Sequence, residues 1–203
     1  TFVFFCISSV VAAGLFSLIT PFICDIWLSP AYELGWGTAV LCIVVLLIKI
    51  MGLPLSLMMG VTGLFEKEKN AGASSAVLNL VVSLALVRPY GMTGVLLGTL
   101  LSYLLQICYR YVIFFRDFLE MKEEAIRYAR DLGEYTAVMI LEVAVTRRII
   151  PLIYGNGGMT PFISCFVLCI LVPLALNGVF FGRGWRLQSI VKMVRGMKRS
   201  GSR

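Results

Sequence analysis

The chain has 203 residues, of which 59% are hydrophobic and 14% are charged, and its mean hydropathy is +0.91. Roughly a quarter of the residues of a soluble domain are charged, so this composition excludes an ordinary soluble protein. The net charge of +7 does not indicate nucleic-acid binding, because the cations flank apolar runs and seven of the 18 lie within 183–203. The absence of His excludes imidazole catalysis and His-containing metal sites, and we expect no cofactor.

Six long apolar runs follow one another along the chain. About 20 apolar residues cross a bilayer core as a helix, and these runs are continuously apolar where barrel strands would alternate. We therefore predict an all-α, polytopic transmembrane helical bundle. Because the chain begins at Thr1 inside an apolar run, without a charged leader, we expect it to be the C-terminal part of a larger protein. The predicted spans are 1–23, 37–64, 71–88, 92–115, 134–154 and 161–182.

The distribution of cations predicts the side of the membrane that each loop faces. Cytoplasmic loops carry an excess of Lys and Arg. If 65–70, 116–133 and 183–203 are cytoplasmic, 13 of the 18 cations lie on that side. The chain then consists of four spans in 1–115, a cytoplasmic connector at 116–133, two further spans in 134–182, and a basic cytoplasmic tail at 183–203.

The connector and the tail both have an amphipathic pattern. Each pattern predicts a helix that lies on the inner membrane surface, and anionic lipid would attract the tail. A solvated basic end is the alternative for the tail. Apolar residues of the connector recur at steps of three and four, at Phe118, Met121, Ala125, Tyr128 and Leu132.

Lys49 is the most informative single residue, because it lies near the middle of span 37–64. A cation at this depth is costly and generally faces a partner or a water-filled cavity. Gly52 and Pro54 follow, and proline removes a helical hydrogen bond, so we predict a kink there. A kinked helix with a central Lys suits a cavity wall that binds an anionic group such as pyrophosphate. The alternative is a Lys paired with a carboxylate on a helix outside this chain.

Two other charged residues lie within predicted spans. Arg110 is about one turn from the inner end of its span. Its side chain either snorkels to the interface or contacts the substrate, and in the second case Gln106 would contribute to the same contact. Glu142 precedes Arg147 and Arg148 at a spacing that does not favour pairing within one helix. Two roles remain open for Glu142: a partner in an interhelical ion pair, or a carboxylate that binds and releases a proton.

Small and polar residues in the third and fourth spans predict helix packing. Asn79 and Ser83 are expected to form interhelical hydrogen bonds, and Gly94 and Gly98 form a GxxxG pair that lets two backbones approach. The sequence shows no nucleophile beside a base and no cluster of carboxylates at a membrane face. We therefore predict that the protein is not an enzyme.

The stretch 63–103 has a recognisable order of residues. A Gly-Leu-Phe helix end precedes a charged turn, an Asn-Leu-x-x-Ser-Leu helix and a helix with regularly spaced glycines. This order resembles the polysaccharide repeat-unit flippases, the Wzx-type branch of the multidrug/oligosaccharidyl-lipid/polysaccharide exporter superfamily, over about residues 1–118. The residues concerned are Gly63-Leu64-Phe65, Lys69, Asn79-Leu80, Ser83-Leu84, Gly91, Gly94-Val95, Gly98-Thr99 and Ser102-Tyr103.

The resemblance implies the exporter fold, with these six helices as the last of about 12 to 14 and an N-terminal lobe of the same protein completing a cavity. It implies a multi-pass protein of the bacterial inner membrane that flips an undecaprenyl-pyrophosphate-linked oligosaccharide by alternating access. The expected partners are this lipid-linked oligosaccharide, the lipid bilayer and polysaccharide assembly proteins, with a proton or sodium ion as the coupling ion. A cation-coupled drug exporter using Glu142, a membrane enzyme of glycan assembly and a membrane scaffold are the alternatives.

Overall fold

The computed structural model describes residues 1–29, 31, 35–118, 122–155 and 158–181. This part of the chain is helical and contains no strand, which confirms the predicted all-α class. The predicted amphipathic tail at 183–203 lies outside the described residues. The α-helices are α1 (Phe2–Pro21), α2 (Trp36–Val61), α3 (Phe65–Tyr90), α4 (Met92–Val112), α5 (Lys122–Tyr154) and α6 (Met159–Phe181), and π-helical turns at Phe22–Trp27 and Ile113–Phe118 extend α1 and α4.

Five helices in the described residues are long and apolar enough to cross a membrane. Helices of 23 to 26 residues reach about 35–39 Å, which exceeds the hydrocarbon core of about 30 Å. The chain is therefore a multi-pass membrane protein. Helix α5 does not meet the same criterion, because Glu142, Arg147 and Arg148 interrupt its apolar stretch. The five spans are Phe2–Trp27, Trp36–Val61, Glu66–Tyr90, Met92–Arg116 and Met159–Phe181.

Helix α5 extends across the predicted boundary between the connector 116–133 and the span that follows it. Its 33 residues form one helix, which passes through position 133 without a break. Ala125 and Tyr128 were expected to face the membrane surface, but they pack against a core formed by the ends of α2 and α4. The Tyr111 hydroxyl donates a hydrogen bond to the Ala125 carbonyl at 2.7 Å. Among the described residues of this stripe, Ala125 and Tyr128 are therefore covered by the protein itself.

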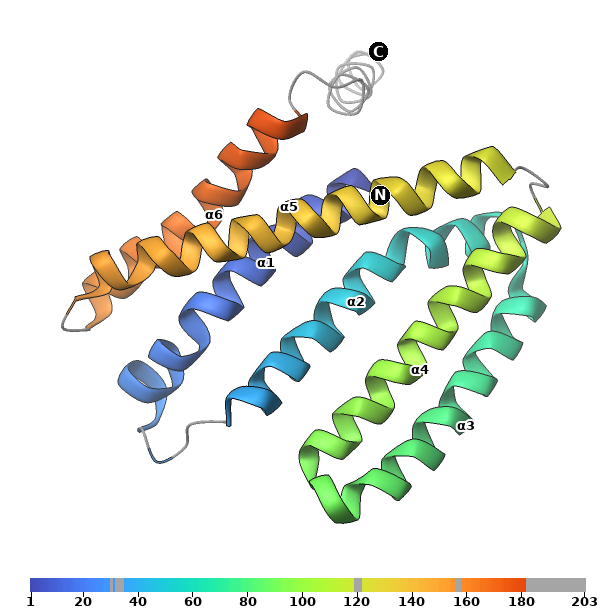
Figure 1. Cartoon of the computed structure of the whole chain (residues 1–203), viewed down its shortest axis with the longest axis horizontal. Helices are drawn as coiled ribbons and strands as arrows, with labels where there is room; N and C mark the ends of the chain where they lie inside the picture. Colours follow the sequence, from blue (N-terminus) through green and yellow to red (C-terminus); the bar gives the residue numbers. More distant parts are fainter. Residues whose placement is uncertain (30, 32–34, 119–121, 156–157, 182–203) are drawn as a thin grey trace, which may run out of the picture.

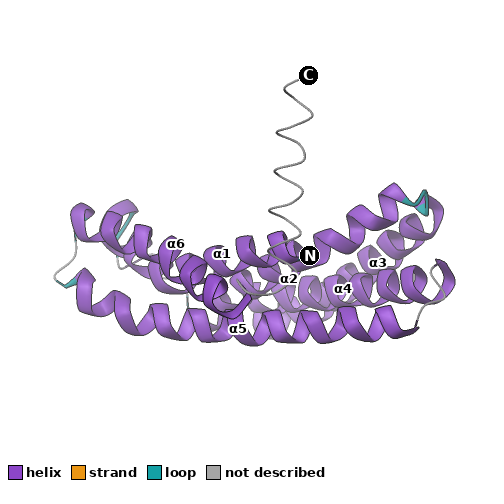
Figure 2. Cartoon of the chain, turned by 90° about the horizontal axis from the view of Figure 1, so that it is seen from above, coloured by secondary structure: helices purple, strands orange, loops and turns teal. Residues whose placement is uncertain are grey.

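The helices form two neighbouring groups (Figure 1). In one group α1, α5 and α6 pack against one another, and in the other α4 lies between α2 and α3. Contacts between α1 and α2 join the groups, and the beginning of α5 also reaches the end of α4. Figure 2 shows that the two groups share one shallow layer, along which α5 runs.

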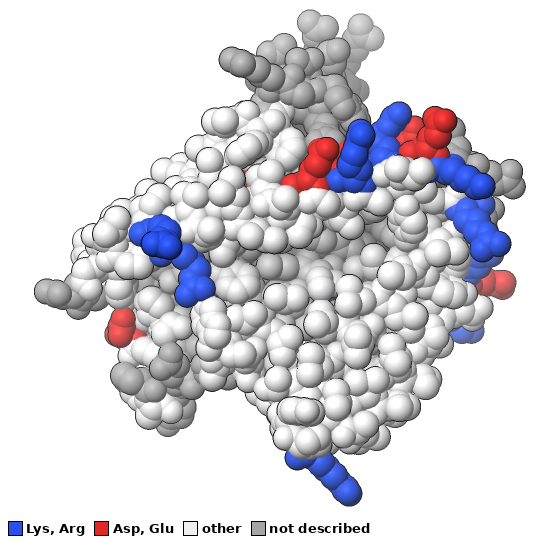
Figure 3. All heavy atoms as spheres, in the orientation of Figure 1, with Lys and Arg blue, Asp and Glu red and all other residues white. Residues whose placement is uncertain are grey.

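The charged side chains gather mainly at one end of the bundle. Figure 3 shows them along a rim over the start of α5 and the neighbouring helix ends, above a broad surface with few charges. The ends of α2 and α4 and the start of α5 meet in a shared core, so the predicted cytoplasmic segments 65–70 and 116–133 are at the same end. Arg88 lies near the other end of α3, and Arg147 and Arg148 lie in the second half of α5. This arrangement agrees with the charge asymmetry from which the orientation was predicted.

Candidate functional site

Lys49 lines a pocket of about 230 Å³ between α2 and α4. The lining residues recur at helical spacing on both helices, so that one face of each helix forms a wall. The Lys49 side chain is exposed, and its Nζ lies 6.0 Å from the centre of the Tyr103 ring. Gln106 and Arg110 lie one and two turns further along α4 on the same wall. The structure thus brings the three predicted substrate-binding residues, Lys49, Gln106 and Arg110, to one pocket.

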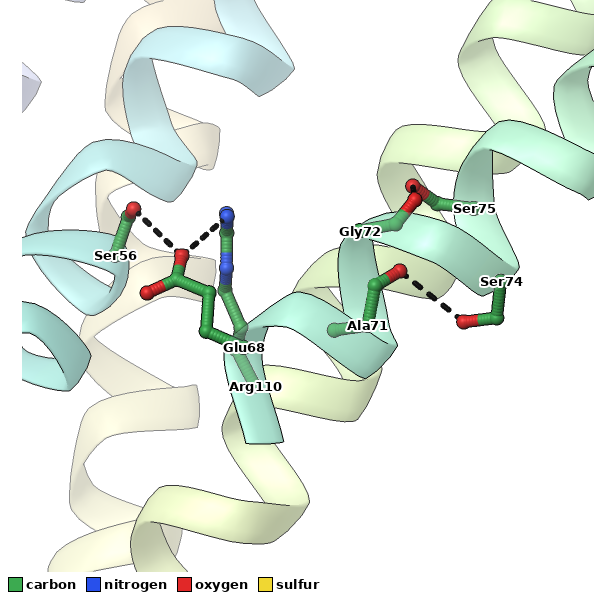
Figure 4. Close-up of polar contacts among 7 residues, drawn as sticks. All are labelled: Ser56, Glu68, Ala71, Gly72, Ser74, Ser75 and Arg110. Atoms are coloured by element: carbon green, nitrogen blue, oxygen red, sulfur yellow. Dashed lines mark hydrogen bonds and ion pairs between the residues drawn. The ribbon is translucent and has the colours of Figure 1, made fainter. Parts of the chain in front are cut away.

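Arg110 closes the inner end of this pocket through an ion pair. Its Nη2 lies 2.6 Å from Oε1 of Glu68 on α3, and the Ser56 hydroxyl donates to the same oxygen at 3.1 Å (Figure 4). The side chains of Arg110 and Glu68 are 13% and 23% exposed. Because Arg110 is partly buried and has a carboxylate partner, its presence in an apolar span is explained without snorkelling to the interface. Its charge is largely compensated, whereas Lys49 has no ion pair among the described residues.

An apolar cavity of about 540 Å³ adjoins the polar pocket. It lies among α1, α2, α4 and α5, and Tyr128 and Thr136 supply the hydroxyl groups in its lining. Ile48 and Ile107 line both cavities, so a thin apolar partition separates them. The two cavities together present a cationic polar compartment beside a larger apolar one. That combination matches the two ends of an amphiphile with an anionic head group.

Comparison with known proteins leaves the pocket unassigned. No family model, curated protein or solved structure matches the chain. The resemblance in 63–103 therefore stays a prediction, and the function has to be inferred from the geometry of the described residues.

Gly52 and Pro54, which were predicted to kink α2, are both buried. The helix continues through Pro54 to Val61 without a break, so the kink stays a prediction. Gly52 has a second role at the pocket, because a Cβ there would lie 3.0 Å from Cδ1 of Ile107. The missing side chain lets α2 and α4 approach each other directly beside Lys49.

The predicted packing residues bring α3 and α4 into a tight hairpin. A Cβ on Gly94 would collide with the Leu86 carbonyl, and one on Gly98 would collide with the Ser83 hydroxyl. Ser83 donates a hydrogen bond to Oδ1 of Asn79 at 3.0 Å within α3. Small residues on α4 therefore face polar and backbone atoms of α3, as a GxxxG interface requires. The one-residue turn between the helices uses Gly91 at φ +55°, a conformation that favours glycine.

Glu142 lies away from the polar pocket, fully buried where α5 faces α1 and α6. Neither carboxylate oxygen has a hydrogen-bond partner among the described residues. Arg147, five residues later, is exposed and instead stacks over the Trp36 ring at 4.5 Å. The ion pair that the sequence left open is thus absent from the described part of the chain.

Glu68 and Ser56 are site residues that the sequence analysis missed. Glu68 was assigned to the charged loop 65–70, but α3 begins at Phe65 and holds Glu68 in its first turn. Acidic residues are favoured at helix N-termini, which explains the presence of Glu68 in the sequence without any role in a binding site. The available signal was Arg110, since an arginine within an apolar span requires a partner. Among the described residues no group of His, Cys, Asp and Glu could hold a metal ion.

The Glu68–Arg110 ion pair should contribute measurably to stability. We expect Glu68→Gln and Arg110→Gln each to lower the free energy of unfolding by about 1–3 kcal/mol, because each leaves its half-buried partner unpaired. The double variant should lose less than the sum of the two. Thermal unfolding of the purified protein in detergent measures this cycle, and strictly additive losses would contradict the pairing.

The Arg130–Glu134 pair provides a matched control. Its atoms are 3.9 Å apart and its side chains are 72% and 47% exposed. Such exposed pairs contribute about 0–1 kcal/mol, so Arg130→Gln should leave the unfolding temperature nearly unchanged.

Proposed function

We propose that this chain is part of a membrane transporter that moves an amphiphile with an anionic head group from the inner to the outer leaflet. The observation that carries the proposal is Lys49, an exposed cation in a membrane-spanning helix, on the wall of a polar pocket. A cation is costly at this depth and is generally found where it meets a partner or water. An ammonium group binds phosphate as a compact point charge, without a need for bidentate geometry.

The neighbouring apolar cavity supports an amphiphilic substrate. Its volume of about 540 Å³ is more than twice that of the polar pocket, and both cavities share the Ile48 and Ile107 walls. A head group next to Lys49 would place the first part of an apolar tail at that partition. Arg110 and Glu68 would hold the inner end of the pocket in shape, and Gln106 would donate to or accept from sugar hydroxyls.

The resemblance of 63–103 makes the proposal more specific. The substrate would be an undecaprenyl-pyrophosphate-linked oligosaccharide, and the membrane would be the bacterial inner membrane. A further lobe would face the polar pocket, and rocking of the two lobes would expose the head group to each side in turn. Polysaccharide assembly proteins would supply and receive the glycan. A proton or sodium ion would drive the cycle.

Drug export within the same superfamily is the second candidate. Buried Glu142 favours it, because a carboxylate without a partner in the bundle interior is suited to cation coupling. An apolar drug would fit the larger cavity, but it would give Lys49 no role. The lipid-linked substrate uses both cavities, which is why we favour it.

Deletion of the gene that encodes this chain tests the proposal. We expect lipid-linked oligosaccharide to accumulate on the cytoplasmic leaflet and a surface glycan to be lost, with both restored by a plasmid copy. Leaflet position can be measured by access of the glycan to an added glycosidase in sealed inverted and right-side-out vesicles. An unchanged glycan with new sensitivity to small cationic drugs would overturn the flippase proposal in favour of drug export.

A further inference from the structure

Helices α1, α5 and α6 pack against one another through two apolar layers. At one end Phe5, Tyr135 and Phe181 pack together, and the Phe5 and Tyr135 rings stack at 4.5 Å between centres. At the other end Leu18 and Ile150 pack with the two buried cysteines of α6. These pairings fix the register, in which α1 and α5 run in the same direction and α6 runs opposite to them.

A polar layer lies between these two apolar ends. Ser9 and Asn177 are each four residues, or about 6 Å, from the aromatic layer, and Glu142 is seven residues, or about 10 Å, from it. Side chains on the parallel helices α1 and α5 both lean towards the aromatic layer, and the longer side chain of Glu142 reaches further back than that of Ser9, towards the level of the Ser9 hydroxyl. The Ser9 hydroxyl faces that carboxylate without completing a hydrogen bond to it.

The members of this layer are buried and lack partners. Ser8, Ser9 and Glu142 are fully buried, and Asn177 is 4% exposed. Their side-chain oxygens, and the Asn177 nitrogen, have no hydrogen-bond partner among the described residues. Thr146 is not available to Glu142 as a donor, because its hydroxyl donates to the Glu142 backbone carbonyl at 2.6 Å. Several unsatisfied polar groups in one buried layer are costly unless a ligand satisfies them.

No cation of the described chain neutralises Glu142. Helices α1 and α6 contain no Asp, Glu, Lys or Arg between their printed bounds, and Arg147 and Arg148 on α5 are exposed. The titratable groups that these helices present are the thiols of Cys6 on α1 and of Cys165 and Cys169 on α6. The layer therefore holds one negative charge, with the Ser9 hydroxyl facing it and the neutral oxygens of Ser8 and Asn177 buried at a similar level along their helices.

We propose that Glu142, with Ser8, Ser9 and Asn177, binds one monovalent cation, either a proton or a sodium ion. A proton would bond to a carboxylate oxygen and let the resulting hydroxyl donate a hydrogen bond within the layer. A sodium ion would take the carboxylate, hydroxyl and amide oxygens, which are the hard donors that such cations prefer. Either ion neutralises the charge; a proton adds one hydrogen-bond donor to the layer, whereas a sodium ion accepts electron pairs from several of the unpaired oxygens. The site is separate from the Lys49 pocket and stands independently of the proposed substrate.

The test is the dependence of thermal stability on the cation. A ligand that binds the folded state raises its unfolding temperature as the ligand concentration rises. The complete protein, as its gene encodes it, should therefore be more stable at acidic pH if the ligand is a proton, and in sodium chloride compared with choline chloride if it is sodium. Glu142→Gln keeps the size and removes the charge, so it should remove the contribution of Glu142 and leave a clearly weaker cation dependence than that of the wild-type protein. An unchanged dependence in Glu142→Gln, or none in the wild-type protein, would overturn the proposal.

Two further measurements separate the site from a general effect on folding. Ser9→Ala should raise the cation concentration for half-maximal stabilisation by about fivefold, the effect of one lost hydrogen bond, while Ser17→Ala, two turns along α1, should not. Dicyclohexylcarbodiimide, which adds covalently to protonated carboxyl groups in apolar surroundings, should modify Glu142 and spare exposed Glu134 on the same helix. Acidic pH should accelerate this modification, and bound sodium should slow it. A rate that is independent of both would contradict cation binding at Glu142.

Discussion

Lys49→Ala is expected to reduce translocation of the lipid-linked substrate by at least about tenfold, with normal amounts of the protein in the membrane. Two cations line the polar pocket in the described part of the chain, and Arg110 is paired with Glu68. Lys49 is the one whose charge is not compensated by an ion pair among the described residues. Loss of a hydrogen bond to a charged group costs about 1.5–3 kcal/mol, which corresponds to roughly a tenfold to hundredfold effect. Complementation of the deletion strain measures it, through surface glycan and lipid-linked intermediates. An immunoblot of the membrane fraction verifies the protein level.

Three further variants define the role of Lys49. Lys69→Ala removes an exposed lysine at the start of α3, outside both cavities, and should leave transport unchanged. Lys49→Arg should retain part of the activity, because it keeps the charge but changes the geometry of the donor. Gly52→Val should impair transport with every charge in place, since the new side chain would meet Ile107 and fill the pocket. Wild-type transport by Lys49→Ala would exclude Lys49 from substrate binding.

Gly94→Ala and Gly98→Ala should each destabilise the protein by about 1–3 kcal/mol, although each adds a single methyl group. The new carbon would collide with the Leu86 carbonyl in one case and with the Ser83 hydroxyl and backbone in the other. Backbone atoms cannot move aside as a flexible side chain can, so α3 and α4 would have to separate. Thermal unfolding in detergent should show lower transition temperatures, and less protein should reach the membrane.

Gly14→Ala is the matched control for these two variants. Gly14 also lies within a helix that can span the membrane, but a Cβ at this position would meet no atom within 4 Å. The substitution should be neutral or slightly stabilising, because alanine has the higher helix propensity. A loss of stability equal to that of Gly98→Ala would show that helix glycines in general, and not the α3–α4 contact, are responsible.

The helices were largely predictable because the membrane imposes their length and composition. Continuous apolar runs with few charges marked five of the spans, and the short gap between the predicted spans 71–88 and 92–115 contains the sharp turn between α3 and α4. The beginning of α5 was not predictable in the same way. An amphipathic stripe indicates that a helix face is covered, but it does not distinguish a lipid surface from another part of the protein. The contact of Tyr128 with the ends of α2 and α4 decides between them.

The candidate sites were predictable only in part, for a related reason. A lone cation within an apolar run is conspicuous, so the sequence pointed to Lys49 and Arg110. The partner of Arg110 comes from a charged segment, where Glu68 has three charged neighbours of similar appearance. The polar layer around Glu142 depends on the register of three helices, which no single segment reveals. Serines on α1 become meaningful only when Phe5, Tyr135 and Phe181 are seen to meet.

The uninterrupted course of α5 has a mechanical consequence. Thirty-three residues make a rod of about 50 Å, well beyond the roughly 30 Å depth of a bilayer core. One end of this rod is anchored to α2 and α4 through Ala125 and Tyr128, and its middle is anchored to α1 and α6. A continuous helix resists bending more than a loop would, and Gly133 is the glycine that lies between these anchorages. We therefore expect a tilt of one helix group to displace the other through α5.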